Sequence, residues 1–441
     1  MSQQITSSRG LKALNTELRV DMTISREAQR NQYDETLNPT GSFPLNIAEN
    51  RLNWAMLKAK FKQICSQHEI DDWVLAYTAA SGAPEFKAAI AAFYQRYFQP
   101  GVAVDPMSLA ISPGATGIVE MTAFILGDAG DTAAMPAPCY PVYRQDMNNM
   151  AGVLRYDIIT HGPLDELAHG PLLNLSHLAQ AKTDIAANGS RLRLLIITTP
   201  DNPTGVIYDQ RHLLEIAEWC IAEEVHLIVN EIYALSAIDR THKTIKDDYP
   251  DVDDFTSFLS IMADKQSNYL HHWYSFSKDF GISGFRVGVL HSHNEELIKA
   301  YENFNMTHSV SNHTQWMLMH LLGDSTFLDK YIGVNQQAIT TSYVEVVTLC
   351  RKHEIPYVPS YGGLFIWIDM ARYLQADSQA AEMTLWMDLY ESTGILLTPG
   401  QGFGHLGFGK YRVVYPYVSL KKLRVALAKM DSFLLGRSAE A

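Results

Sequence analysis

Hydrophobic and polar residues follow two distinct patterns along the middle of the chain. Short unbroken apolar runs, typical of buried strands, are separated by longer segments in which apolar residues recur at helical spacing. The apolar runs are residues 194–199, 226–230, 269–275 and 286–291, and the clearest helical segment is 209–224. Strands that alternate with helices predict an α/β fold with a mostly parallel central sheet covered by helices on both faces.

The C-terminal third has a different pattern. Helical periodicity dominates residues 315–352, and shorter segments of both kinds follow. The predicted strands are 364–368 and 411–418, and the predicted helices are 383–393 and 420–435. These segments predict a smaller α/β domain. Because no Gly/Ser-rich linker separates it from the rest, we expect it to pack closely against the larger domain.

Composition and charge narrow the class of protein. The 441 residues are 47% hydrophobic and 19% charged, so the chain can bury a large core and is not disordered over most of its length. The 35 Lys and Arg residues against 48 Asp and Glu residues give a net charge of −13, which excludes an electrostatic footprint for nucleic acid or an anionic membrane. The polar N-terminus lacks the apolar core of a signal peptide, and no apolar stretch is long enough to cross a membrane. We expect a cytoplasmic enzyme.

The sequence offers little that could hold a metal ion. Its four cysteines show no C-x-x-C spacing and are too few for a disulfide framework, which favours a reducing compartment. The histidines His271, His272, His291 and His293 have no Cys or carboxylate at an obvious ligand spacing. We therefore expect no metal site.

The motif with the most chemistry is a lysine, Lys278, that follows an apolar strand and precedes a Gly-rich turn. A lysine that is buried or lines a cleft has a lowered pKa, and a Schiff base requires the neutral amine. Ser275, Ser277 and Arg286 would supply hydrogen-bond donors for a phosphate close by. The alternatives are a solvated surface lysine and a Ser-x-x-Lys hydrolase. The hydrolase pattern also needs a Lys-Thr-Gly triplet, and the chain has none.

Three other segments invite a functional interpretation. Small residues at 112–117 open a predicted helix and would let an anion approach free backbone N–H groups, although a plain turn has the same composition. The proline-rich loop 136–141 could present the flat face of Tyr140 to an aromatic ligand, or Tyr140 could be an ordinary core residue. Residues 402–407 match G-x-G-x-x-G, but a strand follows them instead of a helix. We interpret them as a flexible loop and not as a dinucleotide site.

Nine motifs occur in one order along the chain. They are Ile47-Ala48-Glu49-Asn50, Gly82-Ala83-Pro84-Glu85-Phe86, Gly114-Ala115-Thr116, Pro138-Cys139-Tyr140-Pro141, Asn202-Pro203-Thr204-Gly205, Asn230-Glu231-Ile232-Tyr233, Ser275-Phe276-Ser277-Lys278-Asp279, Gly284-Phe285-Arg286-Val287-Gly288 and Tyr411-Arg412-Val413. In this order they resemble the class I/II aminotransferases, fold type I enzymes that use pyridoxal 5′-phosphate (PLP). Within that family the chain most resembles the 1-aminocyclopropane-1-carboxylate (ACC) synthase branch, from about residue 38 to about 430. The resemblance implies a large PLP-binding domain at 56–314, a small C-terminal domain at 315–441, and an N-terminal segment, 1–55, that joins the small domain.

The resemblance also implies catalytic roles. Lys278 would hold PLP as a Schiff base and then move the substrate Cα proton as general base and acid. Tyr233 and Asn202 would hydrogen-bond the ring oxygen of the cofactor, and Asn230 would face its pyridine nitrogen. Arg412 would bind the substrate α-carboxylate as a bidentate fork, which a lysine could not imitate.

Further contacts implied by the resemblance surround the cofactor and the substrate. The phosphate would be bound by Arg286, Ser275, Ser277, Gly114, Ala115 and Thr116. Tyr140 would stack on the pyridine ring, and Ala48 and Glu49 would approach an amino acid substrate. Enzymes of this family form homodimers with active sites at the subunit interface, where Tyr77 could reach the phosphate of the partner subunit.

Two positions depart from the family pattern. Asn230 stands where the family has an Asp that pairs with the protonated pyridine nitrogen, and an amide should leave a weaker electron sink. The chain could be an engineered variant, the reaction could need less of a sink, or Glu231 could compensate. The last is disfavoured because adjacent strand residues face opposite sides. Ala80 stands where ACC synthases have a Tyr that contacts the active site, which counts against ACC formation.

We predict a PLP-dependent enzyme that labilises Cα of an amino acid, and the first hypothesis is an aminotransferase that uses a 2-oxo acid as acceptor. The second is an ACC synthase-like lyase that eliminates or cyclises at Cγ, with S-adenosylmethionine as a candidate substrate in specialised biosynthesis. Glu49 favours this second hypothesis. A third is a PLP-fold binding protein with reduced catalysis, which only Asn230 supports. The sequence does not indicate which amino acid is bound.

Overall fold

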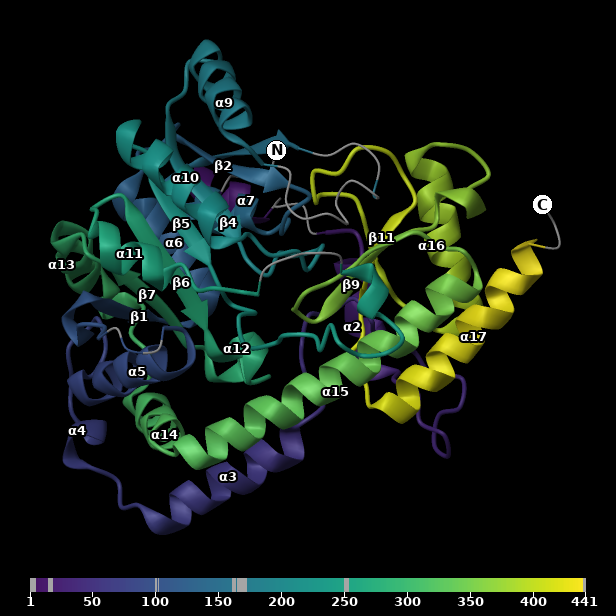
Figure 1. Cartoon of the computed structure of the whole chain (residues 1–441), viewed down its shortest axis with the longest axis horizontal. Helices are drawn as coiled ribbons and strands as arrows, with labels where there is room; N and C mark the ends of the chain where they lie inside the picture. The colour runs from purple at the N-terminus through teal and green to yellow at the C-terminus, as the bar shows by residue number, and fades with distance from the viewer. Residues whose placement is uncertain are drawn as a thin grey trace.

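The computed structural model describes residues 5–14, 19–99, 101, 103–160, 164, 173–249 and 254–438. Figure 1 shows two units side by side, a larger one around a seven-stranded sheet and a smaller one around a four-stranded sheet. Among the described helices, none is long and apolar enough to span a bilayer.

The larger sheet has the strand order β1-β7-β6-β5-β4-β2-β3. The strands are β1 Leu109–Ser112, β2 Thr132–Ala137, β3 Leu154–Ile159, β4 Leu192–Thr198, β5 His226–Asn230, β6 Leu270–Ser275 and β7 Gly288–Ser292. The chain direction of β7 is opposite to that of β6 and β1, and the pairs from β6 to β3 are all parallel. The predicted, mostly parallel α/β sheet is confirmed. Strand β7 begins two residues after the predicted start because Arg286 is left-handed, with φ of 54°.

Helices cover both faces of this sheet, as predicted. Along β4, Leu195 and Ile197 pack into one hydrophobic cluster while Leu194 and Ile196 pack into the cluster on the opposite face, as the two-residue period of a strand requires. The first face is covered by α3 Trp54–Gln67, α5 Pro84–Tyr97, α9 Leu175–Ala187, α10 Gln210–Ala222, α11 Leu259–Lys265 and α14 Asn312–Leu322. The second face is covered by α6 Gly114–Leu126, α7 Tyr143–Ala151 and α13 Glu295–Phe304. Single-turn helices are α4 Asp72–Leu75 and α12 Phe276–Asp279.

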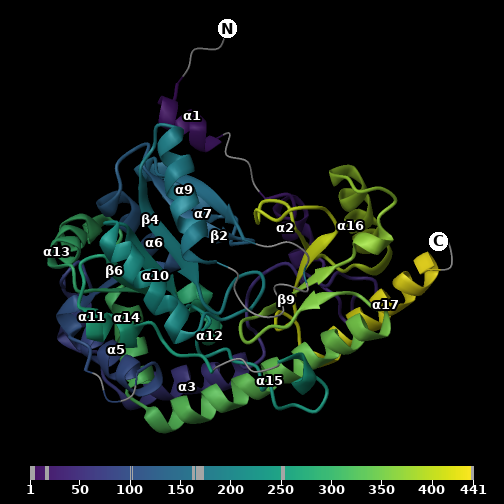
Figure 2. The ribbon, with the colours of Figure 1, turned by 45° about the horizontal axis from the view of Figure 1, so that its top comes forward.

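The smaller unit combines both ends of the chain. Its antiparallel sheet has the order β10-β11-β9-β8 and consists of β8 Tyr357–Val358, β9 Phe365–Asp369, β10 Thr398–Pro399 and β11 Lys410–Val414. The helices α2 Met22–Arg30, α15 Ser325–Lys352, α16 Gln379–Thr393 and α17 Leu420–Ser438 pack around it. Phe43 and Leu45, from the N-terminal segment, are buried in the same core. Figure 2 shows the first helix, α1 Ser8–Leu14, standing apart over the larger unit, where Lys12 donates a hydrogen bond to Asn148 of α7.

One helix belongs to both units. Leu328 and Tyr331, near the start of α15, pack in the core of the larger unit, whereas Ile339 and Tyr343 pack in the core of the smaller unit. Helix α14 packs against α3, α4 and α5 of the larger unit and against α15. The predicted boundaries at residues 55 and 314 stay predictions.

Candidate active site

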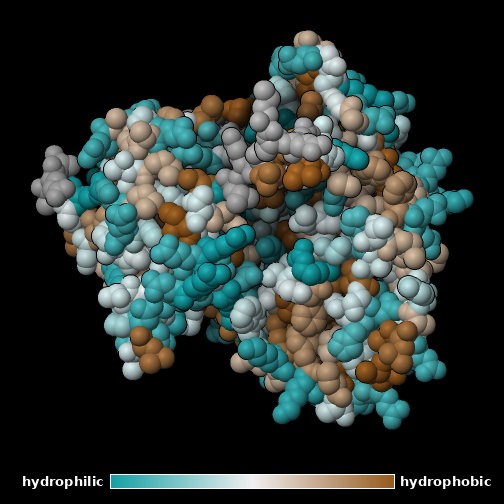
Figure 3. Space-filling model, turned by 180° about the vertical axis from the view of Figure 1, so that it is seen from behind, coloured by the Kyte–Doolittle hydropathy of each residue, from teal (hydrophilic) through white to brown (hydrophobic). Residues whose placement is uncertain are grey.

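A cavity of about 1400 Å³ lies where the two units meet. It is at the carboxyl ends of β4 and β5, the edge at which open α/β sheets bind ligands. Figure 3 shows the hollow between the two lobes on the face of the molecule opposite to that of Figure 1. Twelve of the predicted site residues line the cavity: Ala48, Glu49, Ala115, Thr116, Tyr140, Asn202, Asn230, Tyr233, Ser277, Lys278, Arg286 and Arg412.

The amine of Lys278 is the central nucleophilic group of the cavity. Lys278 lies on α12, directly after β6, and its Nζ donates to the carbonyl oxygen of Ala48 at 2.6 Å. Burial, followed by the positive charge of Arg412, lowers the pKa of Lys278 to about 8, while Glu49 acts in the opposite direction. The next residue, Asp279, anchors the turn by accepting hydrogen bonds from Ser236 Oγ at 2.6 Å and from the backbone of Leu235 at 3.1 Å. The amine is therefore held in place, and it becomes neutral as the pH rises through about 8 instead of through the usual range of a lysine.

An anion-binding cradle lies beside this amine. Helix α6 begins at Gly114, and the guanidinium of Arg286 lies against its first turn, donating to the carbonyl oxygens of Pro113 at 3.2 Å and Ser283 at 2.9 Å. Gly114 has φ of 81°, and a Cβ there would lie 2.5 Å from Arg286 Nη2. Only glycine permits this approach. Ala115 and Thr116 of this first turn line the cavity together with Arg286, so the free N–H groups at the helix start and the positive charge of the guanidinium are both next to the cavity.

Three predicted residues do not line the cavity. Gly114 is buried at the start of α6 and is not among the lining residues. Ser275 is fully buried, donates to the carbonyl oxygen of Val287 at 2.7 Å and accepts from the Ser277 backbone at 3.3 Å, so its hydrogen bonds favour orienting Ser277 over contacting a phosphate. Tyr77 is 98% exposed and is not among the residues that line the cavity. The phosphate roles of Ser275 and Tyr77 stay predictions.

Asn230 closes the cavity floor at the end of β5. Its Nδ2 donates to the hydroxyl of Tyr143 at 2.8 Å, and its Oδ1 accepts from the backbone of Ile232 at 3.2 Å. The Tyr143 hydroxyl lies 3.1 Å from Thr198 Oγ1. Glu231 faces the other side of the sheet, where it binds the backbone of Phe258 at 2.6 Å among other groups. The predicted opposite orientation of Glu231 is confirmed, so this carboxylate cannot replace the one absent at position 230.

Aromatic residues frame the space above Asn230. Tyr140 packs edge-on against Tyr143 at 5.3 Å between ring centroids, and burial raises the pKa of Tyr140 to about 12. Tyr233 packs edge-on against Phe365 at 5.1 Å, and burial likewise raises the pKa of its hydroxyl. Both phenols are neutral hydrogen-bond donors at physiological pH.

Arg412 enters the cavity from β11 of the smaller unit. It is 1% exposed, and its guanidinium donates to Asn202 Oδ1 at 2.8 Å and to the carbonyl oxygen of Asn46 at 2.9 Å. Phe365 and Phe403 lie 5.4 Å from its Cζ. Burial, followed by the charge of Arg19, lowers the pKa of Arg412 to about 10, so it remains cationic at neutral pH. Its Nε has no acceptor among the described residues.

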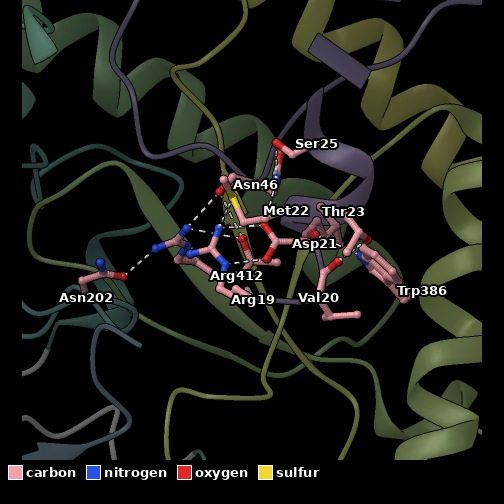
Figure 4. A network of polar contacts seen from close by, with 12 residues as sticks. Arg19, Val20, Asp21, Met22, Thr23, Ser25, Asn46, Asn202, Trp386 and Arg412 are labelled. Atoms are coloured by element: carbon pink, nitrogen blue, oxygen red, sulfur yellow. Dashed lines mark hydrogen bonds and ion pairs between the residues drawn. The ribbon is translucent and has the colours of Figure 1, made fainter. Parts of the chain in front are cut away.

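The sequence analysis did not identify the residues that hydrogen-bond to Arg412 and to its partner Asn46 (Figure 4). Asn46 uses its carbonyl oxygen to accept from Arg412 and its Nδ2 to donate to Asp21 at 2.7 Å. Asp21 in turn accepts two hydrogen bonds from Arg19. Thr398 lies 3.3 Å from Arg412 Nη2. These contacts join separate segments of the chain, so no local spacing marks them, and Asp21 before a helix reads simply as a capping residue.

Glu49 is engaged by protein groups. One carboxylate oxygen accepts from Arg51 at 2.7 Å, and the other accepts from Ser283 at 3.0 Å. Arg51 itself stacks on Tyr417, with 3.7 Å from Cζ to the ring centroid. Glu49 therefore lines the cavity as a held charge, and a direct contact with substrate stays a prediction.

A nucleophilic lysine after β6, an arginine beside the start of α6 and a buried arginine from β11 line one cavity. Such a set suits an aldehyde cofactor with a phosphate group and a substrate with a carboxylate. This is the arrangement of a fold type I, PLP-dependent enzyme. The chain belongs to the aminotransferase class I and II family, whose family model matches residues 44–430.

The curated relatives bear the same name in several plants. The chain is 29% identical over 428 residues to 1-aminocyclopropane-1-carboxylate synthase 1 of Oryza sativa subsp. indica, covering 93% of this chain and 84% of that protein. It is 28% identical over 415 residues to 1-aminocyclopropane-1-carboxylate synthase 1 of Prunus mume, covering 92% of this chain and 81% of that protein.

Solved structures share the fold at lower identity. Aspartate aminotransferase of Thermus thermophilus, as a single mutant, superposes with a TM-score of 0.77 at 19% identity, covering 98% of this chain and 100% of that chain. The aromatic aminotransferase of Pyrococcus horikoshii OT3 gives a TM-score of 0.72 at 22% identity, covering 89% and 96%. The predicted fold type I architecture is confirmed.

The residues present fit PLP. Ala115 and Thr116 at the start of α6 line the cavity together with Ser277 and Arg286, and they supply backbone N–H groups, a hydroxyl and a positive charge of the kind that holds a phosphate. Lys278, with a pKa of about 8, supplies the amine for a Schiff base, and Tyr140 supplies an aromatic face. The protein is a PLP-dependent enzyme that labilises Cα of an amino acid, as predicted. The chemistry that PLP supplies when bound is withdrawal of electrons from Cα.

Proposed function

We propose that the protein is an aminotransferase that moves the amino group of an amino acid to a 2-oxo acid. The observation that carries the proposal is that Lys278, from α12 of the larger unit, and Arg412, from β11 of the smaller unit, line one cavity. Arg412 binds the α-carboxylate, and its hydrogen bonds to Asn202 and Asn46 fix the plane of the guanidinium. Cα would then face Lys278, whose neutral amine would remove the proton from Cα and return it to the carbon of the cofactor on the far side of the substrate nitrogen.

The residues at the floor of the cavity, Asn230 and Tyr143, should weaken the withdrawal of electrons from Cα. Asn230 is uncharged, and its neighbour Tyr143 has a hydroxyl whose pKa is raised by burial, so neither group supplies a charge to the pyridine nitrogen. Proton removal from Cα is therefore slower than with a carboxylate at this position. We propose that the enzyme works with a weak electron sink, which favours substrates that need modest activation.

An ACC synthase-like lyase is the second candidate, and Glu49 is the observation that favours it. A carboxylate in the cavity could attract a cationic sulfonium, as in S-adenosylmethionine, and the curated relatives are named ACC synthases. Against it, Arg51 and Ser283 already occupy both oxygens of Glu49, and Ala80 is small and 8% exposed. These contacts place transamination first.

We propose a homodimer in the cytoplasm. Tyr77, at 98% exposure, has no role within its own subunit, and other large apolar side chains are exposed as well. They are Ile70, Leu75, Phe124, Phe304 and Met306. A second copy that covered them would bring Tyr77 to the phosphate cradle of the partner subunit. The four free thiols suit a reducing compartment. Light scattering should give twice the chain mass, and a monomeric mass would contradict the dimer.

The product distinguishes the two reactions. With PLP-loaded protein and single amino acids, an aminotransferase releases a 2-oxo acid in stoichiometric amount and leaves the cofactor in its amine form until a 2-oxo acid is added. A lyase acting on S-adenosylmethionine turns over repeatedly without an acceptor and releases methylthioadenosine. Repeated release of methylthioadenosine, together with no conversion of the cofactor to its amine form by any amino acid, would contradict the proposal. Mass spectrometry identifies the products, and the absorbance spectrum of the cofactor reports its amine form.

A further inference from the structure

An arginine of β3, Arg155, holds the loop that carries Tyr140. Its side chain is 3% exposed, and each nitrogen of its guanidinium has a contact within the protein. Nη1 donates to the carbonyl oxygens of Tyr140 at 3.1 Å and Pro141 at 3.0 Å, and Nη2 lies 2.9 Å from Cys139 Sγ. Nε donates to Asp157 Oδ1 at 2.7 Å. One guanidinium thus contacts three consecutive residues of a single loop.

Asp157 fixes the plane of this guanidinium. Asp157 and Arg155 are two residues apart on one strand, so both side chains lie on the same face of β3, and both line the cavity. Burial raises the pKa of the Cys139 thiol, so the sulfur beside Arg155 is neutral and the carboxylate balances the charge. Because a guanidinium is planar, its hydrogen bond to Asp157 also sets the direction in which Nη1 donates.

The same loop is held from the smaller unit. The backbone N–H of Cys139 donates to the carbonyl oxygen of Phe403 at 2.8 Å, and the ring of Phe403 lies 5.4 Å from Arg412 Cζ. Nearby, Gly404 has φ of 80°, and a Cβ there would lie 2.9 Å from Asp157 Oδ2. The backbone around Tyr140 is therefore fixed between β3 of the larger unit and the loop that joins β10 to β11.

We infer that Arg155 is a positioning residue: by holding the backbone at Tyr140 and Pro141, it fixes the ring of Tyr140 in the place where it stacks on the cofactor. Stacking depends on the offset and the distance between two rings, so a loop that can shift stacks less tightly. The inference goes beyond the proposed function, because it rests on the predicted stacking of Tyr140 and applies equally to transamination and to a lyase reaction.

The first test measures the Kd of PLP for the cofactor-free protein. Arg155→Met keeps much of the side-chain bulk but loses every donor, and it should raise the Kd by about 10-fold. Arg155→Lys keeps the charge opposite Asp157 and one donor, so a rise of about 3-fold is expected. The matched control is Arg193→Met. Arg193 lies on β4 of the same sheet and donates to the carbonyl oxygen of Leu126 at 2.6 Å, but it does not line the cavity.

A second test removes the ring that Arg155 is proposed to position. In a Tyr140→Leu background, Arg155→Met should change the Kd of PLP by less than about 2-fold, because no ring is left to orient. A general loss of stability, or repulsion of the phosphate by an unpaired Asp157, would instead persist in that background. At saturating PLP, Arg155→Met should also weaken the visible circular dichroism of the bound cofactor, which reports a fixed aromatic neighbour, while its absorbance is retained.

These measurements need no amino acid, so their outcome is separate from the test of the proposed function. A 10-fold effect of Arg155→Met that persists without the Tyr140 ring would overturn the inference, and so would an equal effect of Arg193→Met. Thermal unfolding of the cofactor-free variants shows which of them fold. If Arg155→Met does not fold, the comparison is made with Arg155→Lys, whose smaller effect should also vanish in the Tyr140→Leu background and would overturn the inference if it persisted there.

Discussion

The two walls of the cavity are built in different ways. The wall proposed to bind the phosphate, called the phosphate wall, is formed by Ala115, Thr116, Ser277, Lys278 and Arg286. These residues come from two short segments that each follow one strand or open one helix. The wall proposed to bind the α-carboxylate, called the carboxylate wall, is formed by Arg412 with Asn46, Asn202, Asp21 and Arg19, which come from four distant regions of the chain. A substitution in the phosphate wall should disturb only its immediate neighbours. A substitution in the carboxylate wall should also displace the residues that are hydrogen-bonded to the substituted one.

The sharpest local change is Lys278→Ala in the phosphate wall. It removes both the Schiff-base amine and the group that moves the Cα proton, so the rate should fall by at least about 10³-fold. After borohydride reduction the cofactor should no longer be covalently attached to the protein, because no Schiff base with the protein exists to be reduced. A variant that still carries covalently attached cofactor after reduction would show that another amine holds it. Lys265→Ala, an exposed pair with Glu218, is the control.

In the carboxylate wall, Arg412→Lys keeps the charge but loses the planar fork. We expect kcat/KM to fall by about 10²-fold for every amino acid, since all share the α-carboxylate. Because Asn202 and Asn46 lose their donor, the thermal unfolding temperature should also fall. Steady-state kinetics with a substrate panel, combined with calorimetry, measures both effects. A loss confined to one substrate class would contradict the α-carboxylate role.

The floor between the two walls tests the weak electron sink. Asn230→Asp places a carboxylate where Tyr143 and the Ile232 backbone can donate to it, so the new charge is accommodated. It should hold the pyridine nitrogen protonated and raise the rate of Cα proton removal by about 10-fold. The ¹⁵N shift of ring-labelled PLP reports the protonation separately from the rate. A protonated nitrogen with an unchanged or lower rate would show that the site is adapted to the amide.

The smallest effect concerns the pH dependence of cofactor loading. Burial lowers the pKa of Lys278 to about 8, and the neutral amine is the reactive form, so loading should accelerate as pH rises through 8 and then level off. Glu49 raises this pKa, so Glu49→Gln should move the midpoint to lower pH by a few tenths of a unit. Stopped-flow absorbance from pH 6 to 10 measures the midpoint, with Glu35→Gln as the surface control. A midpoint that moves to higher pH would contradict the sign.

The difference between the walls also explains what the sequence could predict. Lys278 and Arg286 lie in one segment whose strand, turn and glycines are visible as a pattern, and β5 lies at its predicted residues. Arg412 and Asn202 entered through the family resemblance. The sequence could not predict the roles of Asn46, Asp21 and Arg19, because these roles depend on which distant segments of the chain come into contact. The burial of Ser275 depends in the same way on the position of Val287 across the β6–β7 pair.

Helix α15 couples the unfolding of the two units. Its 28 residues run without a break from one hydrophobic core into the other, and its Asn335 contacts both Asn50 of the N-terminal segment and the carbonyl oxygen of Asp279, next to Lys278. Neither unit can lose this helix while the other keeps it intact. Heating should therefore melt the protein in a single cooperative transition, and the smaller unit expressed alone should lack a complete core. The active site is assembled only when the entire molecule is folded.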